Sequence, residues 1–287
     1  MRNKIIDGKE IASRIKKEIV SEISLIKKER KFLPKLVSLI VGDIPQTVSY
    51  CNSQRKVCLE LGIEFEIIKL NENISQQQLA NKIEKLNGDN LVGGIILNLP
   101  LPSHIKQYEV QNKISQLKDV ECVTSRNLGE LIYTDKEPKI YPCTAQAVVE
   151  CLRKTRVSLK GKEIVIVGHS EIVGKPLSML LLKSKFNSPT VTVCHISTRD
   201  LLFHTKRAEI LIVAVGKPNF VNSSMIKKGS IIIDVGINKL NDSIVGDVNF
   251  NDVIKKASKI TPVPGGVGAI TSYLLIKNFI TLCKIRD

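Results

Sequence analysis

The sequence predicts an α/β protein of two domains, and three observations lead to this fold class. Short apolar strands alternate with helical segments along the chain, which is the pattern of β–α–β units around parallel sheets. The length of 287 residues corresponds to two domains of roughly 100–200 residues each. Hydrophobic residues make up 43% and charged residues 25%, which is typical of soluble globular chains and excludes a chain that is disordered throughout.

The first part of the chain contains one set of alternating elements. Isoleucines recur every three or four residues between 8 and 28, and this spacing predicts an amphipathic helix. A second helix at 47–61 is expected to end at Gly62, because glycine readily adopts the left-handed conformation that closes many helices. A third helix is predicted at 74–86. Apolar runs predict strands at 36–41 and 93–97, and an alternating pattern predicts a strand at 64–70.

A second set of elements begins after residue 142. The stretch 119–142 has weak periodicity and many turn-forming residues, so we place the connection between the domains there. The first domain is then expected to end near residue 140. The second set and the C-terminal segment contain predicted helices at 145–154, 174–183 and 270–285 and predicted strands at 164–167, 191–194, 210–215 and 231–235.

The positive charge lacks the pattern of a nucleic-acid-binding protein. Lys and Arg number 43 against 28 Asp and Glu, for a net charge of +15, but the lysines are spread along helices. Aromatic residues are only 4% and Trp is absent, so the platforms on which bases stack are scarce. We interpret the charge as a solvated basic surface, with attraction of an anionic small ligand as the alternative, and expect no nucleic-acid partner.

Membrane and metal sites have little support in the sequence. No apolar run approaches the ~20 residues that span a bilayer, and the charged N-terminus has no apolar core of a signal peptide. The seven cysteines are odd in number and contain no C-x-x-C pair, and the four histidines show no metal-ligand spacing. We therefore expect a reduced, cytoplasmic protein with no membrane partner and no metal.

The strongest local signal for a ligand is the segment IVIVGHSEIVGKP. A strand runs into a turn at Gly168, and a helix opens near Gly174, an arrangement that directs backbone N–H groups at a phosphate. Ser170 occupies the place of the second glycine in G-x-G-x-x-G, so this motif alone is a moderate signal. Gly216 and Gly236 follow two further strands, at the edge where open α/β sheets bind ligands.

Together with other ordered motifs, this segment gives the chain a resemblance over almost its whole length. The motifs lie at residues 41–43, 49–50, 97–102, 118–120, 141–144, 167–176, 213–218, 234–238, 245–248 and 261–268. They resemble those of the bifunctional methylenetetrahydrofolate dehydrogenase/cyclohydrolase family. The resemblance implies an N-terminal α/β folate-binding catalytic domain, of residues 1–140 with the returning segment 270–287, and a Rossmann-like NADP-binding domain of residues 141–269. It also implies a cleft between the domains and a homodimer.

The same resemblance implies two consecutive reactions of one-carbon folate metabolism, which serves purine biosynthesis. Oxidation of 5,10-methylenetetrahydrofolate with NADP gives the 5,10-methenyl form, and hydrolysis of that form gives 10-formyltetrahydrofolate. Carried over residue by residue, the catalytic positions are Tyr50, Gln54, Asn98 and Glu121. Only Tyr50 matches the family, which has Lys, Gln and Asp at the other three positions.

The resemblance also implies the remaining ligand contacts. NADP is expected to contact Gly168, His169, Ser170, Gly174, Pro176, Ser197, Val215, Gly216 and Ile237. The folate is expected to contact Tyr50, Leu99, Pro100, Glu121, Pro264, Gly265 and Gly266. No acidic residue follows the second strand of the NADP domain to bind a ribose 2′-hydroxyl, so we expect NADP rather than NAD.

The two reactions make different demands on the catalytic positions. Hydride transfer needs positioning more than proton transfer, because nitrogen lone pairs stabilise the developing cation. Hydrolysis needs a titrating group, and Gln54 has none, so the sequence leaves the hydrolysis step in doubt. Lys56 is rotated ~200° from Gln54 around a helix, which disfavours it as a substitute. Glu121 is the remaining acid, with pterin anchoring as its alternative role.

Three interpretations stay open at this point. The chain is a working folate enzyme with both activities or with the dehydrogenase alone. Alternatively, it is a degenerate paralogue that binds folate or nucleotide without turnover. In the third interpretation Asn98 and Glu121 form a pocket resized for a different reduced pterin.

Overall fold

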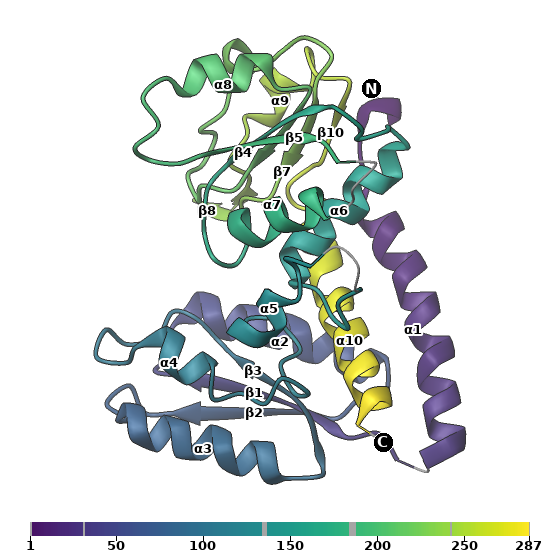
Figure 1. Ribbon diagram of the computed structural model, residues 1–287, viewed down its shortest axis with the longest axis vertical. Coiled ribbons are helices and arrows are strands. Elements are labelled where there is room, and N and C mark those ends of the chain that lie inside the picture. The colour runs from purple at the N-terminus through teal and green to yellow at the C-terminus, as the bar shows by residue number, and fades with distance from the viewer. Residues whose placement is uncertain (1, 31, 134–136, 184–187, 242, 287) are drawn as a thin grey trace. The chain divides into compact units, whose positions relative to one another are not determined.

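The computed structural model describes residues 2–30, 32–133, 137–183, 188–241 and 243–286 (Figure 1). The chain packs into two compact units, which we describe separately. Unit 1 comprises Met1–Arg14, Leu131–Glu137 and Pro142–Thr271. Unit 2 comprises Ile15–Glu130, Pro138–Tyr141 and Ser272–Asp287.

Unit 2 is built on a parallel sheet of order β2-β1-β3. The central strand β1 (Lys35–Val41) pairs with β2 (Phe65–Leu70) on one side and with β3 (Val92–Leu97) on the other. Since β1 and β3 are buried on both faces, they are nearly continuous apolar runs in the sequence. An isolated parallel bridge between Ile95 and Asp119 extends the sheet beyond β3.

Helices cover both faces of this sheet. On one face α3 (Gln76–Gly88) and α4 (Gln107–Gln111) bury leucine, isoleucine and valine side chains against β1 and β3. On the other face lie α2 (Pro45–Glu60) and the C-terminal part of α10 (Gly268–Ile285), and Figure 1 shows α2 and α3 on opposite sides. The remaining helices that contribute to unit 2 are α1 (Gly8–Arg30) and α5 (Ser125–Gly129).

Unit 1 contains a parallel sheet of order β10-β7-β6-β4-β5. Its strands are β4 (Glu163–Val167), β5 (Thr190–Cys194), β6 (Ile210–Val213), β7 (Ile231–Asp234) and β10 (Lys259–Ile260). The chain proceeds from β4 to β5 on one side, and then crosses to β6 on the other side of β4. This reversal creates a switch point between β4 and β6, where open α/β sheets bind their ligands at the carboxyl ends of the strands.

The helices and hairpin of unit 1 complete this arrangement. Helices α6 (Cys143–Thr155) and α7 (Gly174–Leu182) pack against each other, and α7 also contacts β4 and β5. The apolar cluster of the sheet includes side chains from or beside α8 (Leu201–Arg207) and α9 (Phe250–Val253). The shorter elements are the strands β8 (Asn238–Leu240) and β9 (Ser243–Val245) and the 3₁₀ turns η1 (Arg2–Lys4) and η2 (Ser223–Met225).

Two α/β units with parallel sheets confirm the predicted fold class, and the differences from prediction are local. The strands expected at 210–215 and 231–235 end earlier, at Val213 and Asp234, because the loops that follow turn toward buried carboxylates. The hairpin and the short helices α4, α5, α8 and α9 were not predicted, since segments this short carry little periodicity. None of the helices in the described ranges has the length and apolarity needed to cross a bilayer.

Candidate functional site

A buried chain of polar contacts ties α2 to the carboxyl end of β3. Asn98 follows β3, and its Nδ2 donates a hydrogen bond to Ser38 Oγ on β1 at 2.7 Å. Ser38 Oγ in turn lies 3.2 Å from Cys51 Sγ on α2. One helical turn earlier, Thr47 Oγ1 donates to the carbonyl oxygen of Leu99 at 3.2 Å. These contacts bring Asn98, Leu99 and one face of α2 together, and they turn the Asn98 amide toward β1.

Gln54 lies on this same buried face of α2 but makes no comparable contact. It is only 1% exposed, and it stands in a helical stripe with Thr47, Cys51 and Cys58, all of which are buried. Neither Nε2 nor Oε1 of Gln54 has a hydrogen-bond partner among the described residues. Leaving a buried polar atom unpartnered costs about 1–3 kcal/mol, and native proteins keep few such groups. The Gln54 amide therefore offers an unused donor and an unused acceptor on the buried face of α2, where the resemblance implies a lysine.

The other predicted folate contacts of unit 2 lie near the surface. Tyr50 is 43% exposed, one helical turn before Gln54. Leu99 is half-buried and Pro100 is exposed in the segment that follows β3. A flat aromatic ring and an exposed loop beside a strand end can contact a planar ligand from the solvent side.

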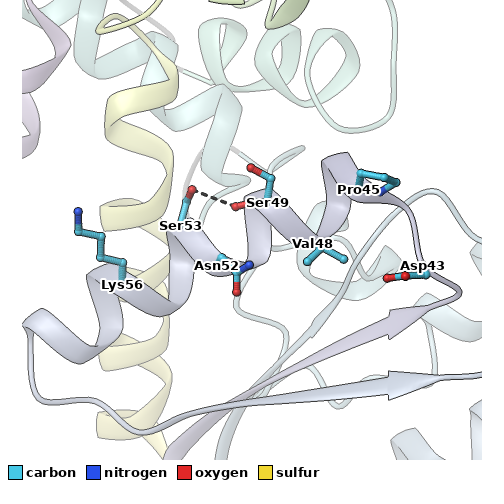
Figure 2. A pocket seen from close by; sticks show the side chains of 7 residues that line it. All are labelled: Asp43, Pro45, Val48, Ser49, Asn52, Ser53 and Lys56. Atoms are coloured by element: carbon cyan, nitrogen blue, oxygen red, sulfur yellow. Dashed lines mark hydrogen bonds between the residues drawn. The ribbon is translucent and has the colours of Figure 1, made fainter. Parts of the chain in front are cut away.

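Lys56 lies on a different side of α2 from Gln54. Lys56 lines a shallow hollow of about 640 Å³ together with Ser49 and Ser53. Figure 2 shows these three side chains along one side of α2. Lys56 is exposed, and Gln54 does not line this hollow. The rotation expected from the sequence is thus confirmed, and Lys56 is poorly placed to supply an amine at position 54.

Glu121 belongs to a turn that is fixed by a fully buried carboxylate. Asp119 accepts hydrogen bonds from the N–H groups of Val123 (3.0 Å) and Thr124 (2.9 Å), from Thr124 Oγ1 (2.8 Å) and from Asn127 Nδ2 (2.9 Å). Burial, with a smaller contribution from the charge of Asp119, raises the pKa of Glu121 to about 8. A carboxyl group with this pKa is largely protonated at neutral pH and can donate a proton.

In unit 1, a pocket of about 520 Å³ opens at the carboxyl ends of β4, β5 and β6. Four of the predicted nucleotide contacts line it, and they are Gly168, His169, Ser170 and Val215. Lining residues that the sequence did not single out for the nucleotide are His195, Ile196, Thr198, Leu201, Ala214, Lys217 and Phe220. In the sequence these residues share one feature, which is that each follows a strand of the parallel sheet. Which of them reach the pocket depends on how the loops fold, and the sequence pattern does not show this.

The turn between β4 and α7 has the geometry of a phosphate-binding turn. Gly168 has φ +121° and donates its N–H to the carbonyl of Cys194 at 2.8 Å. A side chain at Gly174 would overlap the carbonyl of Gly168, so only glycine allows this close approach. Helix α7 begins without a side-chain cap, and in its first turn Lys175 donates its N–H to Ser170 and Pro176 has none, so the N–H of Gly174 is the group at this end that can face a ligand.

Basic and polar groups surround this turn. The rings of His169 and His195 lie 4.9 Å apart between centroids. His195 Nδ1 accepts the N–H of Ser197 at 3.2 Å, so the neutral imidazole carries its proton on Nε2 and presents a donor there. Lys217 adds an ammonium group to the same pocket. The pocket therefore suits an anionic ligand with an apolar part, which Ile196 and neighbouring side chains can contact.

Several predicted contacts lie outside this pocket within the described part of unit 1. Pro176 is buried in the first turn of α7, whereas Ser197, Gly216 and Ile237 are exposed in loops. Among the predicted folate contacts of this unit, Pro264 is exposed, and Gly265 accepts the N–H of Gly8 through its carbonyl oxygen at 2.9 Å. Gly266 is buried where a side chain would overlap the carbonyl of Pro262.

The raised pKa of Glu121 predicts a pH-dependent stability. Because the group binds its proton more tightly in the folded protein, its contribution to stability is fully present below about pH 4.5 and is lost as the pH rises through about 8. As the pH rises from mildly acidic to alkaline, we expect the free energy of unfolding of the wild type to fall relative to that of Glu121→Gln. Denaturant unfolding of both proteins across this range measures the difference. Glu72→Gln, at an exposed carboxylate, is the control; equal pH dependence of wild type and Glu121→Gln would contradict the prediction.

The pocket of unit 1 yields a second prediction, on cofactor choice. We expect His169→Glu to raise the KM for NADP by ~10-fold or more, because the new carboxylate repels the 2′-phosphate, and to change the KM for NAD much less. His169→Gln is the matched uncharged control. Steady-state rates with each nucleotide provide the measurement. An equal rise in the KM for NADP and for NAD would contradict a position of the 2′-phosphate beside His169.

Comparison with known proteins agrees with this geometry. Bifunctional protein FolD of Clostridium perfringens is 46% identical over 285 residues, which cover 99% of this chain and 100% of that protein. The crystal structure of the bifunctional enzyme FolD from Campylobacter jejuni matches with a TM-score of 0.93 and 41% identity over 99% of both chains. The Trypanosoma brucei N5,N10-methylenetetrahydrofolate dehydrogenase-cyclohydrolase, complexed with NADP cofactor and inhibitor, has a TM-score of 0.93 and 34% identity, covering 99% and 98%.

Family models match both parts of the chain. The catalytic domain of tetrahydrofolate dehydrogenase/cyclohydrolase matches residues 6–121. The NAD(P)-binding domain of the same family matches residues 142–287. The parallel sheets, the pocket at the switch point and these matches lead to one conclusion, which is that the chain belongs to the tetrahydrofolate dehydrogenase/cyclohydrolase family.

Proposed function

We propose that this protein oxidises 5,10-methylenetetrahydrofolate to 5,10-methenyltetrahydrofolate with NADP and that its own hydrolysis of the product is weak. The observation that carries the proposal is the contrast between the two units. The pocket of unit 1 keeps the glycine turn and basic side chains that suit a dinucleotide. In unit 2, the position of the family lysine holds Gln54, which is buried, uncharged and unpartnered.

The dehydrogenation depends on positioning by residues that the chain retains. NADP, when bound, supplies the acceptor for the hydride. Gly168 shapes the turn so that the N–H of Gly174, at the uncapped start of α7, can face its phosphates, and His169 and His195 offer donors to further phosphate oxygens. In unit 2, Tyr50 offers a ring for contact with the folate, and the Gln54 amide can hydrogen-bond it. None of these roles requires a side chain that changes its protonation state.

Hydrolysis of the methenyl cation requires a proton to be moved, and among the four catalytic candidates, all of them described residues, Glu121 fits that task. Its pKa of about 8 keeps it largely protonated at neutral pH, and it lies two residues after Asp119, which bridges to Ile95 of β3. We propose that it anchors the pterin ring through its carboxyl group, and that any residual hydrolysis passes through it. Its role is thus separable from that of Gln54 by mutation.

The family to which the chain belongs supports the remaining features of the proposal. We propose that residues 1–140 with 270–287 form the folate-binding part and that 141–269 form the NADP-binding part. Leu99, Pro100, Pro264, Gly265 and Gly266 are proposed folate contacts, and Gly174, Pro176, Ser197, Gly216 and Ile237 complete the proposed nucleotide set. We further propose a cytoplasmic homodimer that serves one-carbon metabolism and purine biosynthesis, without nucleic-acid or membrane partners.

The direct test of this function follows both reactions in one assay. Purified wild-type protein with 5,10-methylenetetrahydrofolate and NADP should accumulate the methenyl product, because its release outpaces its hydrolysis. The absorbance of the methenyl species measures both appearance and decay. No NADP-dependent oxidation would refute the dehydrogenase and favour a binding protein. Turnover of another reduced pterin, but not of 5,10-methylenetetrahydrofolate, would indicate a pocket resized for that pterin.

Restoring the family residue tests the assignment of Gln54. We expect Gln54→Lys to raise the rate of methenyl hydrolysis by ~10²-fold or more, the range that one general acid–base group supplies. Gln54→Met, which fills similar space without a titrating group, is the matched control and should leave hydrolysis low. Asn98→Gln in the Gln54→Lys background should increase the gain further if the two side chains couple.

Rapid hydrolysis by the unmodified protein, with a pH profile showing one ionisation, would contradict the assignment of Gln54. Glu121→Gln then distinguishes the source of the proton. Loss of that hydrolysis in Glu121→Gln would assign the step to Glu121, whereas retention would assign it to neither residue.

A further inference from the structure

The two loops that follow β6 and β7 are held together by buried carboxylates. Asp247 is completely buried and follows the β8–β9 hairpin. Its Oδ2 accepts the N–H groups of Val215 at 2.6 Å and Gly216 at 2.9 Å, and its Oδ1 accepts the N–H of Lys217 at 2.9 Å. Three successive backbone donors thus converge on one carboxylate, in the manner of an anion-binding nest.

Two further contacts hold Asp247 in place, one at its side chain and one at its backbone N–H. Asn238 Nδ2 donates to Asp247 Oδ1 at 2.8 Å. The backbone N–H of Asp247 donates to Asp234 Oδ1 at 3.0 Å, and the same oxygen accepts the N–H of Gly236 at 3.0 Å. Asp234 Oδ2 accepts the N–H of Val248 at 2.9 Å. The two carboxylates therefore connect the loop after β6, the loop after β7 and the end of the hairpin.

The sequence around this cluster is constrained by its close packing. A side chain at Gly236 would overlap the carboxylate of Asp247, and one at Gly246 would overlap that of Asp234. Neither Asp234 nor Asp247 has an ion pair among the described salt bridges, so the N–H donors supply the compensation for the buried charge. Removing the Asp234 carboxylate would leave three buried N–H donors unpartnered, and removing that of Asp247 would release the part-buried donors of residues 215–217.

The loop that Asp247 holds forms part of the wall of the nucleotide pocket. Val215 and Lys217 both line that pocket, whereas Asp247 itself does not. We infer that Asp247 is a positioning residue for NADP, which sets the backbone of residues 215–217 so that the pocket is formed before the nucleotide binds. This inference rests on the proposed nucleotide function of unit 1 and adds to it a residue that does not touch the ligand.

The test compares Asp247→Asn with wild type and with a matched control. Asp252→Asn is the control, because Asp252 also ties a loop of the same unit, accepting the N–H of Ser223 at 2.7 Å and its hydroxyl at 2.8 Å, but does not line the pocket. We expect Asp247→Asn to raise the Kd and KM for NADP by ~10-fold or more, since two of the four donors to the carboxylate lose their acceptor in either orientation of the amide. The KM for the folate and the kcat at saturating NADP should remain near wild type, and Asp252→Asn should change none of them.

Hydrogen exchange of the backbone amides gives a readout that does not depend on turnover. The amides of Val215, Gly216 and Lys217 should exchange faster in Asp247→Asn, while those of β4 keep their wild-type rates. Unchanged NADP affinity and unchanged exchange at these three amides would overturn the inference. If wild type itself fails to bind NADP, the proposed function fails, but the exchange rates still report whether Asp247 holds the loop.

A milder variant keeps the test decisive if Asp247→Asn does not fold. Asn238→Ala removes one of the donors to Asp247 and leaves the three backbone bonds in place. We expect a smaller change in the same direction, in both NADP affinity and amide exchange. Wild-type values for both quantities in a folded Asn238→Ala protein would overturn the inference.

Discussion

Parallel pairing of strands is the constraint on which the arrangement of both units depends. Because the paired strands of each main sheet run in one direction, their carboxyl ends meet at a single edge, and the loops that follow them are brought together. In unit 2 this edge carries Asn98 and the start of α2. In unit 1 it carries Gly168 after β4, His195 after β5 and Val215 after β6. Each candidate ligand site is therefore a consequence of strand direction.

Buried carboxylates then fix the loops at these edges. Asp119 organises the turn with Glu121, and Asp247 organises the loop 215–217, each through several N–H donors. Burying a carboxylate is unfavourable unless hydrogen bonds replace its hydration, so these residues specify one loop conformation each. The unfavourable effect of burial is seen in the pKa of Asp234. Burial raises this pKa to about 6, although three backbone N–H groups donate to the carboxylate and favour its charged form.

The proposed weakness of hydrolysis depends on three residues of unit 2. Gln54 and Asn98 carry amides that do not titrate, and Glu121 carries a carboxyl group whose pKa is raised to about 8. The nucleotide pocket of unit 1 retains the glycine turn and adds two neighbouring imidazoles. Since hydride transfer depends on positioning and hydrolysis on proton transfer, such a chain can keep the first reaction while weakening the second.

The structure also changes how mutations at the glycine turn should be interpreted. Gly174 approaches the carbonyl of Gly168 so closely that any side chain would displace the turn. A charged substitution at Gly174 therefore cannot separate repulsion of a phosphate from distortion of the backbone. His169 is exposed and lines the pocket, so a charge placed there acts on the ligand with less effect on the turn.

The sequence by itself determined the fold class, the order of the long helices and strands, and the turn at Gly168, because these depend on local periodicity and on glycine. It also indicated that Lys56 points away from Gln54, since that follows from the helical repeat. Only the tertiary structure decided that Gln54 is buried without a partner and that Asn98 bonds back to Ser38. The role of Asp247 was hidden for the same reason: its acceptor atoms meet donors 30 to 32 residues earlier in the chain, and no local pattern records contacts made at that separation.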